Sequence, residues 1–540
     1  MVKRILNLLR EGEKRELVKV AVSIFFSALL DFASLASFMP LLYFLLEGED
    51  EVKAILGFSI IAFVLVAVKS VVSIKLGRYQ ASFTMQLYKR LSYSLFSNYY
   101  NKGLLFIKEQ GYSNLGHSVN YMCYSFSQGI IFPLMRIAAD LLLIILVTVA
   151  LLVYEWKTVL VLYISFLPFM FAYVFLVRDK LKMYAREDFN AKKTQARIVS
   201  DAFRGYSDLE TSNSFGHLLK SFSQGLDTIS TSRTRIDTLQ RIPLFISEFA
   251  IITGFLIMLL VGGPDKSVIL GIFAVAAFRL IPALRGILSC YNAIQNSLPC
   301  IDVLEEGLKV IDIEEQPGDS VCFKDEINVN GLVFNYGSSD INLGNFTVKK
   351  GEYIGFRGYS GIGKTTLFNL MLGFLTPSKG EILIDGIALT RANRASWLKY
   401  IGYVPQDPYI FDCTIAQNIA LGAETPDLKK IEDVLGKVQL LDWVNSLPQK
   451  SNTMLGEGGS TLSGGQKQRI SIARALYKGA DVLLFDEATS SVDIATEKEI
   501  NNMLREMKEG SPHLTILSIA HRESTLAYCS RIINLEKNNG

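Results

Sequence analysis

The sequence contains few residues of the kinds that build disulfide frameworks or metal centres. Its 540 residues include only six cysteines and four histidines. The cysteines form no C-x-x-C pair and no spacing typical of metal ligands; they stand at positions 123, 290, 300, 322, 413 and 529. We therefore expect reduced, mostly packed thiols.

A strong excess of one charge is also absent. The 55 Lys and Arg residues and 52 Asp and Glu residues give a net charge of +3. A surface that binds nucleic acid needs a concentrated basic excess, so we expect no nucleic-acid partner. Internal repeats and low-complexity segments are missing too. We expect no cleavable signal peptide, because residues 1–19 are charged and the apolar run after them is too long.

Apolar residues are what the chain has in abundance. Half of its residues are hydrophobic and the mean hydropathy is +0.28, which is too apolar for two soluble domains. A bilayer requires about 20 residues of helix to cross it. Six apolar stretches are long enough, at 20–46, 54–75, 130–154, 158–177, 242–263 and 267–290.

The basic residues indicate how these spans are oriented. The connections at 75–130 and 178–241 are rich in Lys and Arg, whereas the shorter connections hold one lysine each. By the positive-inside rule, the two long connections and everything after the sixth span are cytoplasmic. We expect each long connection to form two helical arms joined by a turn, near 111–116 and 205–210. These turns are candidates for coupling helices; the alternative is an ordinary solvated loop.

A phosphate-binding loop stands in the second half of the chain. Residues 358–366 fit the pattern G-x-x-x-x-G-K-[ST] and follow a short β-like run. In such a loop, backbone N–H groups and the positive end of the next helix converge on an anion. Lys364 is expected to reach nucleotide phosphates, and Thr365 to bind Mg²⁺. The other expected nucleotide contacts in the loop are Gly358, Ser360, Gly361, Gly363 and Thr366.

Three further segments supply partners for the loop. Residues 462–466 read LSGGQ, which has chance odds on the order of one in a thousand per chain. The apolar run 481–487 ends in Asp486 and Glu487, as expected for a buried parallel strand that delivers carboxylates at its carboxyl end. Asp486 suits a Mg²⁺ site and Glu487 a general base. The strand-like run 514–520 ends at His521, for which we expect a catalytic role.

These motifs, in this order, resemble the nucleotide-binding domain of ATP-binding cassette (ABC) transporters. The resemblance implies that Tyr336 stacks on adenine, that Gln406 contacts Mg²⁺ and senses the membrane domain, and that Asp493 links the two ATP sites of a dimer. In that dimer, the LSGGQ segment of one subunit closes over ATP held by the other; its contacts are Ser463, Gly464, Gly465 and Gln466. Residues 453–459 resemble the extra loop of exporters, which favours export over import.

The sequence thus predicts a multi-domain membrane protein. A six-helix transmembrane domain with long cytoplasmic extensions (1–305) is followed by a linker (306–326) and an α/β P-loop domain of the ABC type (327–540). A homodimer is expected, because every ATP motif is intact in the single chain. We expect it in the cytoplasmic (inner) membrane, with the ATP domain in the cytoplasm.

Several ionisable residues lie inside the predicted spans, where they are energetically costly and usually face the bundle interior. Arg136 and Asp140 are four residues apart, so a structural ion pair is expected. Arg279 and Arg285 have no acid nearby in their own span, and Lys69 lies near the inner end of the second span. We expect these three cations to contact an anionic substrate.

Alternatives to this substrate role remain open. The two arginines can instead pair with Asp31 or Glu248 of other spans, and Lys69 can reach the membrane interface along its aliphatic chain.

The membrane half also resembles the lipid-linked oligosaccharide flippases. The likeness lies in Met39-Pro40 and in residues 278–285 before Tyr291, although the outer connection after the first span is shorter here. The resemblance implies an amphipathic substrate with a pyrophosphate-linked sugar head. The alternatives are a multidrug or peptide exporter and a soluble ATPase of the same superfamily, which the six spans exclude.

Overall fold

The structure is a computed structural model that describes residues 2–38, 52–154, 156–261, 266–309, 319–337, 340–487, 494–520 and 522–535. The chain divides into two units, Met1–Ile311 and Asp312–Gly540. Residues 310–318, the middle of the predicted linker, lie outside the described residues.

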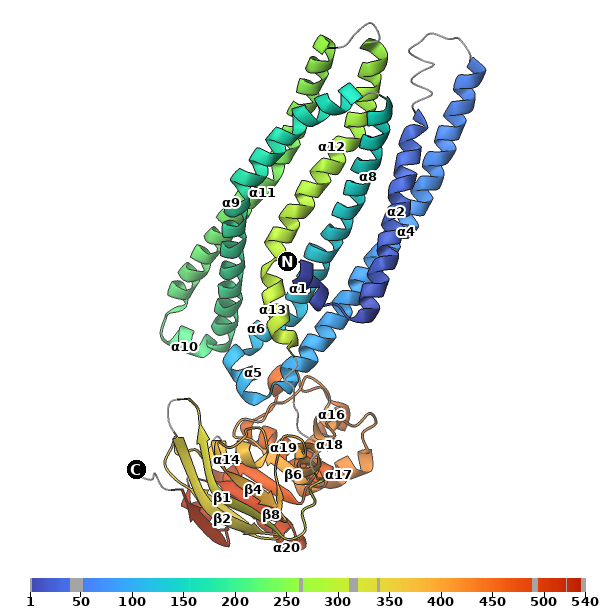
Figure 1. Ribbon diagram of the computed structural model, residues 1–540. Coiled ribbons are helices and arrows are strands. Elements are labelled where there is room, and N and C mark those ends of the chain that lie inside the picture. Colours follow the sequence, from blue (N-terminus) through green and yellow to red (C-terminus); the bar gives the residue numbers. More distant parts are fainter. Residues whose placement is uncertain are drawn as a thin grey trace. The chain divides into compact units, whose positions relative to one another are not determined.

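Long helices make up the first unit, which we call the membrane unit (Figure 1). Six described helical segments are long and apolar enough to cross a membrane, which confirms the predicted six-helix membrane region. Residues 39–46, the end of the first predicted span, lie outside the described residues. The principal helices are α2 (Glu11–Ala36), α4 (Val52–Asn101), α8 (Phe132–Tyr154), α9 (Trp156–Arg204), α11 (Phe215–Val261) and α12 (Lys266–Ser297).

Three of the four predicted arms continue a membrane span as one helix, in α4, α9 and α11. α4 has 50 residues and α9 has 49, so at 1.5 Å per residue each is roughly 75 Å long. α9 lies along α11, and the short helix α10 (Tyr206–Thr211) joins them at the second predicted turn. In Figure 1, α5 and α10 lie at the same end of the membrane unit.

The first predicted turn, 111–116, is placed wrongly. The short helix between the arms is α5 (Leu104–Gln110), and residues 112–117 instead form α6 (Tyr112–His117), where the return arm begins. The physical reason lies in two glycines that bracket α5: Gly103 has a φ of 90° and Gly111 a φ of 75°, values that favour glycine and interrupt a helix. The return arm then includes η1 (Ser118–Met122), α7 (Cys123–Phe126) and η2 (Ser127–Ile131) before α8.

The ends of the membrane unit's chain pack together. Arg4 of α1 (Val2–Asn7) forms ion pairs with Asp302 and Glu305 of α13 (Pro299–Leu308). In the same region, buried side chains from α4, α7, η2 and α13 pack into one hydrophobic core. It includes Leu91, Leu95, Cys123, Phe126, Ile130 and Leu304.

The second unit, the nucleotide unit, is built on a parallel sheet of order β6-β7-β8-β3-β9. Its central strands are short apolar runs buried at nearly every position, as expected for a sheet covered on both faces. The strands are β3 (Tyr353–Arg357), β6 (Ile401–Val404), β7 (Val482–Asp486), β8 (Thr515–Ile519) and β9 (Arg531–Asn534).

An antiparallel sheet of order β2-β1-β4-β5 packs against this core. Its strands are β1 (Glu326–Asn335), β2 (Asp340–Lys349), β4 (Lys379–Ile384) and β5 (Ile387–Ala388). The helices of the unit are α14 (Lys364–Met371), α15 (Arg394–Trp397), η3 (Leu398–Tyr400), α16 (Ile415–Ile419), α17 (Leu428–Lys437), α18 (Leu441–Ser446), η4 (Lys450–Asn452), η5 (Glu457–Gly459), α19 (Gly464–Lys478), α20 (Ile494–Gly510) and α21 (Glu523–Leu526). This arrangement confirms the predicted α/β P-loop fold.

Strand order explains why distant motifs meet. Because parallel strands end at the same edge of a sheet, the segments that follow β3, β7 and β8 lie side by side. These segments begin the phosphate loop, hold Glu487, and lead to His521, which itself lies outside the described residues.

Candidate active site

The phosphate loop runs from the end of β3 to the start of α14. Gly361 and Gly363 have φ values of 83° and 107°, in the region that favours glycine. A Cβ on Gly363 would lie 2.5 Å from the side chain of Ile341. The loop therefore keeps its shape only with glycine at position 363, and the amino end of α14 points into it.

Lys364 is enclosed by this loop. Its side chain is 5% exposed, and its Nζ donates hydrogen bonds to the carbonyl oxygens of Gly358 at 2.8 Å and Tyr359 at 3.4 Å. The same Nζ lies 3.7 Å from Oε1 of Glu487. Burial lowers the pKa of Lys364, and the nearby carboxylates of Glu487 and Asp486 partly oppose this shift. The structure thus brings the predicted phosphate ligand and the predicted general base together.

Asp486 ends β7 and is held by two hydroxyl groups. Oδ1 accepts a hydrogen bond from Thr365 and Oδ2 accepts one from Tyr403, each at 3.2 Å. Burial raises the pKa of Asp486, while the hydrogen bonds from Tyr403 and Thr365 act to lower it. The two predicted Mg²⁺ ligands, Thr365 and Asp486, therefore meet.

These oxygen donors fit a magnesium ion. Mg²⁺ is usually held by one or two protein oxygens together with substrate phosphates and water. Among the described residues, no group of three or more His, Cys, Asp or Glu side chains is arranged to hold a metal. Two protein oxygens that meet, those of Thr365 and Asp486, suit an ion that arrives with a nucleotide. Gln406, the third predicted ligand, follows β6, and its carbonyl oxygen accepts a hydrogen bond from Gln468 at 2.9 Å.

Glu487 has an unusual backbone conformation. Its φ is 47°, which is uncommon for a residue other than glycine and often occurs at functional sites. Its N–H donates to the carbonyl oxygen of Ile519 at 3.2 Å. This bond ties the residue after β7 to the end of β8, two residues before His521.

Tyr336 follows β1 and lies beside the loop helix. Its hydroxyl is 3.1 Å from Oγ1 of Thr366, and its ring packs edge-on against Phe334 with a centroid distance of 4.8 Å. Half of the side chain remains exposed. The structure therefore places Tyr336 next to the phosphate loop with part of its ring available. Asp493 lies outside the described residues.

The LSGGQ segment begins a different helix. Oγ of Ser463 accepts a hydrogen bond from the N–H of Gln466, and Oε1 of Gln466 accepts one from the N–H of Ser463, so the pair forms a capping box at the start of α19. Gly464 and Gly465 form the first turn. α19 packs on β6, α16 and α17, whereas α14 packs on β7. Closure of this segment over a partner's nucleotide stays a prediction.

Sequence reasoning missed the roles of Tyr403 and Glu497. Tyr403 lies on β6, and only the pairing of β6 with β7 shows that its hydroxyl reaches Asp486. Glu497 on α20 is buried and accepts hydrogen bonds from Arg522, Ser524 and Thr525. Burial acts to raise the pKa of Glu497, but these hydrogen bonds outweigh it and the pKa is lowered. The cluster connects α20 to the segment after His521.

Two of the predicted substrate cations pair with an acid from another span. Nη2 of Arg279 on α12 lies 2.8 Å from Oδ1 of Asp31 on α2, and Nζ of Lys69 on α4 lies 2.6 Å from the same oxygen. The acid that pairs with Arg279 comes from another helix, as its own span contains no acid nearby. The pairing of an arginine with Asp31, one of the alternatives, is observed.

The remaining span charges are arranged differently. Arg285 donates a hydrogen bond from Nη2 to the hydroxyl of Ser247 at 2.7 Å, while its buried Nε has no hydrogen-bond partner among the described residues. Nε of Arg136 lies 4.0 Å from Oδ2 of Asp140, as the four-residue spacing predicts. Glu248 is exposed on α11.

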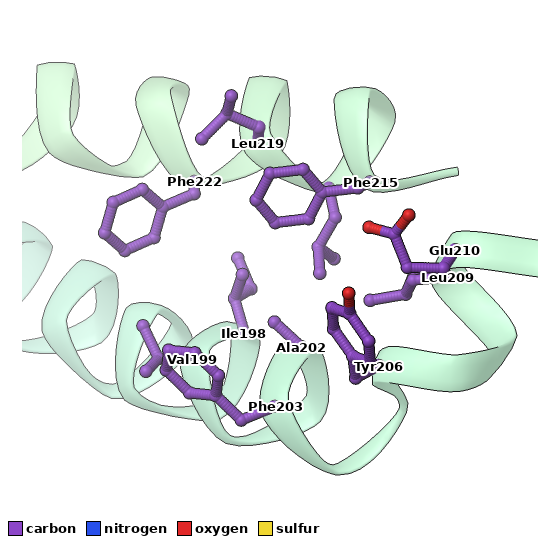
Figure 2. A pocket seen from close by; sticks show the side chains of 11 residues that line it. Ile198, Val199, Ala202, Phe203, Tyr206, Leu209, Glu210, Phe215, Leu219 and Phe222 are labelled. Atoms are coloured by element: carbon purple, nitrogen blue, oxygen red, sulfur yellow. The ribbon is translucent and has the colours of Figure 1, made fainter. Parts of the chain in front are cut away.

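A cavity of about 410 Å³ lies between α9 and α11 near α10. Figure 2 shows the rings of Tyr206 and Phe215 beside it, with the carboxylate of Glu210 at one end. The other labelled side chains are apolar, and Phe203 is 79% exposed. The tip of this arm therefore presents apolar surface, which favours the coupling interpretation over an ordinary solvated loop.

Comparison with known proteins agrees with this geometry. Residues 341–490 match the profile of the family described as ABC transporter. The chain is 29% identical over 461 residues to an ATP-dependent lipid A-core flippase of Burkholderia thailandensis, covering 83% of this chain and 76% of the relative. It is 30% identical over 394 residues to the protein of the same name in Burkholderia pseudomallei strain 1710b, covering 71% of this chain and 65% of the relative.

A solved structure has the same fold over nearly the whole length. The match is to a bacterial Atm1-family ABC exporter with ATP bound, with a TM-score of 0.80, 21% sequence identity, and coverage of 97% of this chain and 93% of that one. Six described helices that can cross a membrane, a P-loop sheet and these similarities together identify the chain as an ABC transporter, with a six-helix membrane domain and a nucleotide-binding domain fused in one polypeptide.

Proposed function

We propose that this protein uses ATP hydrolysis to move a lipid with an anionic, pyrophosphate-linked sugar head across the cytoplasmic membrane. The observation that carries the proposal is the group of cations on membrane helices: Lys69 and Arg279 meet at one carboxylate, and Arg285 lies six residues further along α12. Guanidinium groups match phosphate oxygens bidentately, so such a group suits an anionic head. The lipid A-core flippases that the chain resembles support a lipid substrate.

The nucleotide unit supplies the energy. We propose that ATP lies in the phosphate loop with Lys364 on its phosphates and with adenine against Tyr336. Thr365, Asp486 and Gln406 would hold Mg²⁺, which supplies positive charge to the phosphate oxygens. Glu487 takes a proton from the attacking water, and His521 assists in this step.

The protein is proposed to act as a homodimer, because each chain carries both halves of a composite ATP site. The LSGGQ segment of one chain, with Ser463, Gly464, Gly465 and Gln466, closes over the ATP of the other, and Asp493 links the two sites. ATP binds the closed pair better than the open pair, so it shifts the population toward closure. Because the two long connections are basic, we place the nucleotide unit in the cytoplasm.

Reconstitution tests the proposal. Purified protein in proteoliposomes should translocate a fluorescent polyprenyl diphosphate when ATP and Mg²⁺ are added, and should leave a matched uncharged polyprenol in place. The Glu487→Gln variant, reconstituted in equal amount, should move neither lipid. Transport of lipophilic drugs but not of the diphosphate by the parent protein would overturn the proposal in favour of a multidrug exporter.

A further inference from the structure

One carboxylate oxygen in the membrane unit serves two cations. Oδ1 of Asp31 on α2 lies 2.6 Å from Nζ of Lys69 on α4 and 2.8 Å from Nη2 of Arg279 on α12. No described residue donates a hydrogen bond to the other carboxylate oxygen of Asp31. Two positive charges thus share this oxygen. Asp140 of α8, with its partner Arg136, also lies within electrostatic reach of Asp31 and Arg279. The three cations and two acids together keep a net charge of +1.

The cluster is only partly enclosed. The side chains of Asp31, Lys69 and Arg279 are 21%, 22% and 31% exposed in the isolated chain. A buried structural ion pair normally has its remaining donors satisfied, because an unmatched charge inside a membrane domain is costly. This cluster instead has spare positive charge and an accessible side, which is the arrangement of a site that accepts an anion.

Asp31 occupies the position that an anionic ligand would take. An ammonium and a guanidinium converge on its Oδ1 from two different helices, and both groups bind phosphate oxygens as readily as carboxylate oxygens. A diphosphate has more negative charge and more oxygens than one carboxylate, so it matches the two cations better. It can therefore compete for them.

We propose that Asp31 is a built-in counter-anion that fills the head-group site, and that the anionic head of the substrate displaces it from Lys69 and Arg279. This inference rests on the proposed function, and it adds that the site is closed by its own acid until the substrate binds. The paired state neutralises one of the two cations between transport cycles. It also lowers the apparent affinity for the substrate, because only the fraction with displaced Asp31 is competent to bind.

The test measures how strongly a polyprenyl diphosphate stimulates ATP hydrolysis by the reconstituted full-length protein. Asp31→Asn removes the competing charge but keeps the shape of the side chain. It should lower the half-maximal lipid concentration by about tenfold if the paired state outweighs the displaced state about ten to one. Glu248→Gln is the matched control, since it makes the same kind of change on α11, and it should leave that concentration unchanged.

A second pair of variants keeps the test decisive if two unpaired cations impair folding. Lys69→Gln alone leaves Asp31 to compete for Arg279, whereas Asp31→Asn with Lys69→Gln leaves Arg279 free to bind the lipid. The double variant should respond to several-fold less diphosphate than Lys69→Gln alone. The inference is overturned if the double variant needs as much diphosphate as Lys69→Gln, or more, for half-maximal stimulation. It is also overturned if a folded Asp31→Asn protein needs as much diphosphate as its parent, or more.

The outcomes separate this inference from the function on which it rests. If the parent protein is neither stimulated by the diphosphate lipid nor able to move it, the proposed function fails. If the parent responds to the diphosphate but Asp31→Asn behaves as Glu248→Gln does, only the role of Asp31 fails.

Discussion

Two carboxylates, one in each unit, differ in the charge of their partners. Asp486 in the nucleotide unit accepts hydrogen bonds from the neutral hydroxyls of Thr365 and Tyr403. Asp31 in the membrane unit is paired with two cations, Lys69 and Arg279. Neutral donors leave the charge of Asp486 available for a metal ion, whereas the cations around Asp31 already exceed its charge. We therefore propose that the first site receives a cation and the second an anion.

The comparison teaches that the presence of an acid at a site does not by itself indicate its role. What decides the role is the charge of the groups around it, because an acid held by hydroxyls still attracts positive charge and an acid held by two cations does not.

The largest expected effect concerns the residue next to Asp486. Glu487→Gln should lower ATP turnover on the order of 10²–10⁴-fold, because the amide keeps the shape of the side chain but cannot take a proton from water. Asp481→Asn is the matched control: Asp481 precedes β7 at its other end and pairs with Lys350 at 3.3 Å. Phosphate release by both purified variants measures the difference, and turnover by Glu487→Gln equal to that of the control would remove Glu487 from the mechanism.

The second effect concerns nucleotide binding. Lys364→Ala removes a charged hydrogen-bond donor to phosphate, which is worth about 1.5–3 kcal/mol, so ATP binding should weaken by about 10–100-fold. Lys350→Ala, which removes a lysine away from the loop, should bind ATP as the parent does. A fluorescent ATP analogue titrated into each protein gives the two affinities, and equal affinities would contradict the role of Lys364.

The third prediction concerns the dimer. If Ser463 acts on the nucleotide of the opposite chain, mixing Lys364→Ala chains with Ser463→Arg chains places both lesions at one composite site and leaves the other whole. The mixed protein should keep partial ATPase activity, while each variant alone should have almost none. Equal inactivity of all three preparations would count against two independently working composite sites.

These three predictions were accessible from the sequence for a physical reason. Lys364, Thr365 and the glycines lie in one continuous loop, and Asp486 and Glu487 end one apolar strand, so chain connectivity alone sets most of the geometry. The same holds for the six spans, because an apolar length that crosses a bilayer is a local property.

The contacts that the sequence did not predict, or left as one of several alternatives, join elements distant in the chain. Tyr403 reaches Asp486 only because β6 pairs with β7, and Arg279 reaches Asp31 only because α12 lies near α2. The position of α5 was missed because Gly103 and Gly111 interrupt the helix on both sides of it. Both glycines have positive φ values, which the composition of the sequence does not reveal.

The smallest expected effect concerns the hydrogen bond from Tyr403, one of the two neutral donors to Asp486. Its pKa is raised by burial, and the hydrogen bond from Tyr403 acts to lower it. Tyr403→Phe removes that bond, so the pKa of Asp486 should rise further and the acidic limb of the ATPase pH profile should move to higher pH. The loss at neutral pH should be only several-fold, as expected for one hydrogen bond of about 1 kcal/mol.

Tyr409→Phe is the control for this variant, because Tyr409 is exposed and its hydroxyl makes no contact with Asp486. Identical pH profiles for the two variants would show that Tyr403 does not tune Asp486.

The central claim is that the cations of the membrane unit select the substrate while the nucleotide unit supplies the energy. Its most direct test is the amount of polyprenyl diphosphate moved per ATP hydrolysed by the Arg279→Ala, Arg285→Ala double variant in proteoliposomes. We predict that transport is abolished while basal ATPase activity is largely kept. Loss of ATPase activity together with transport would instead indicate that the arginines hold the helix bundle together. Normal transport by a well-folded double variant would contradict the claim.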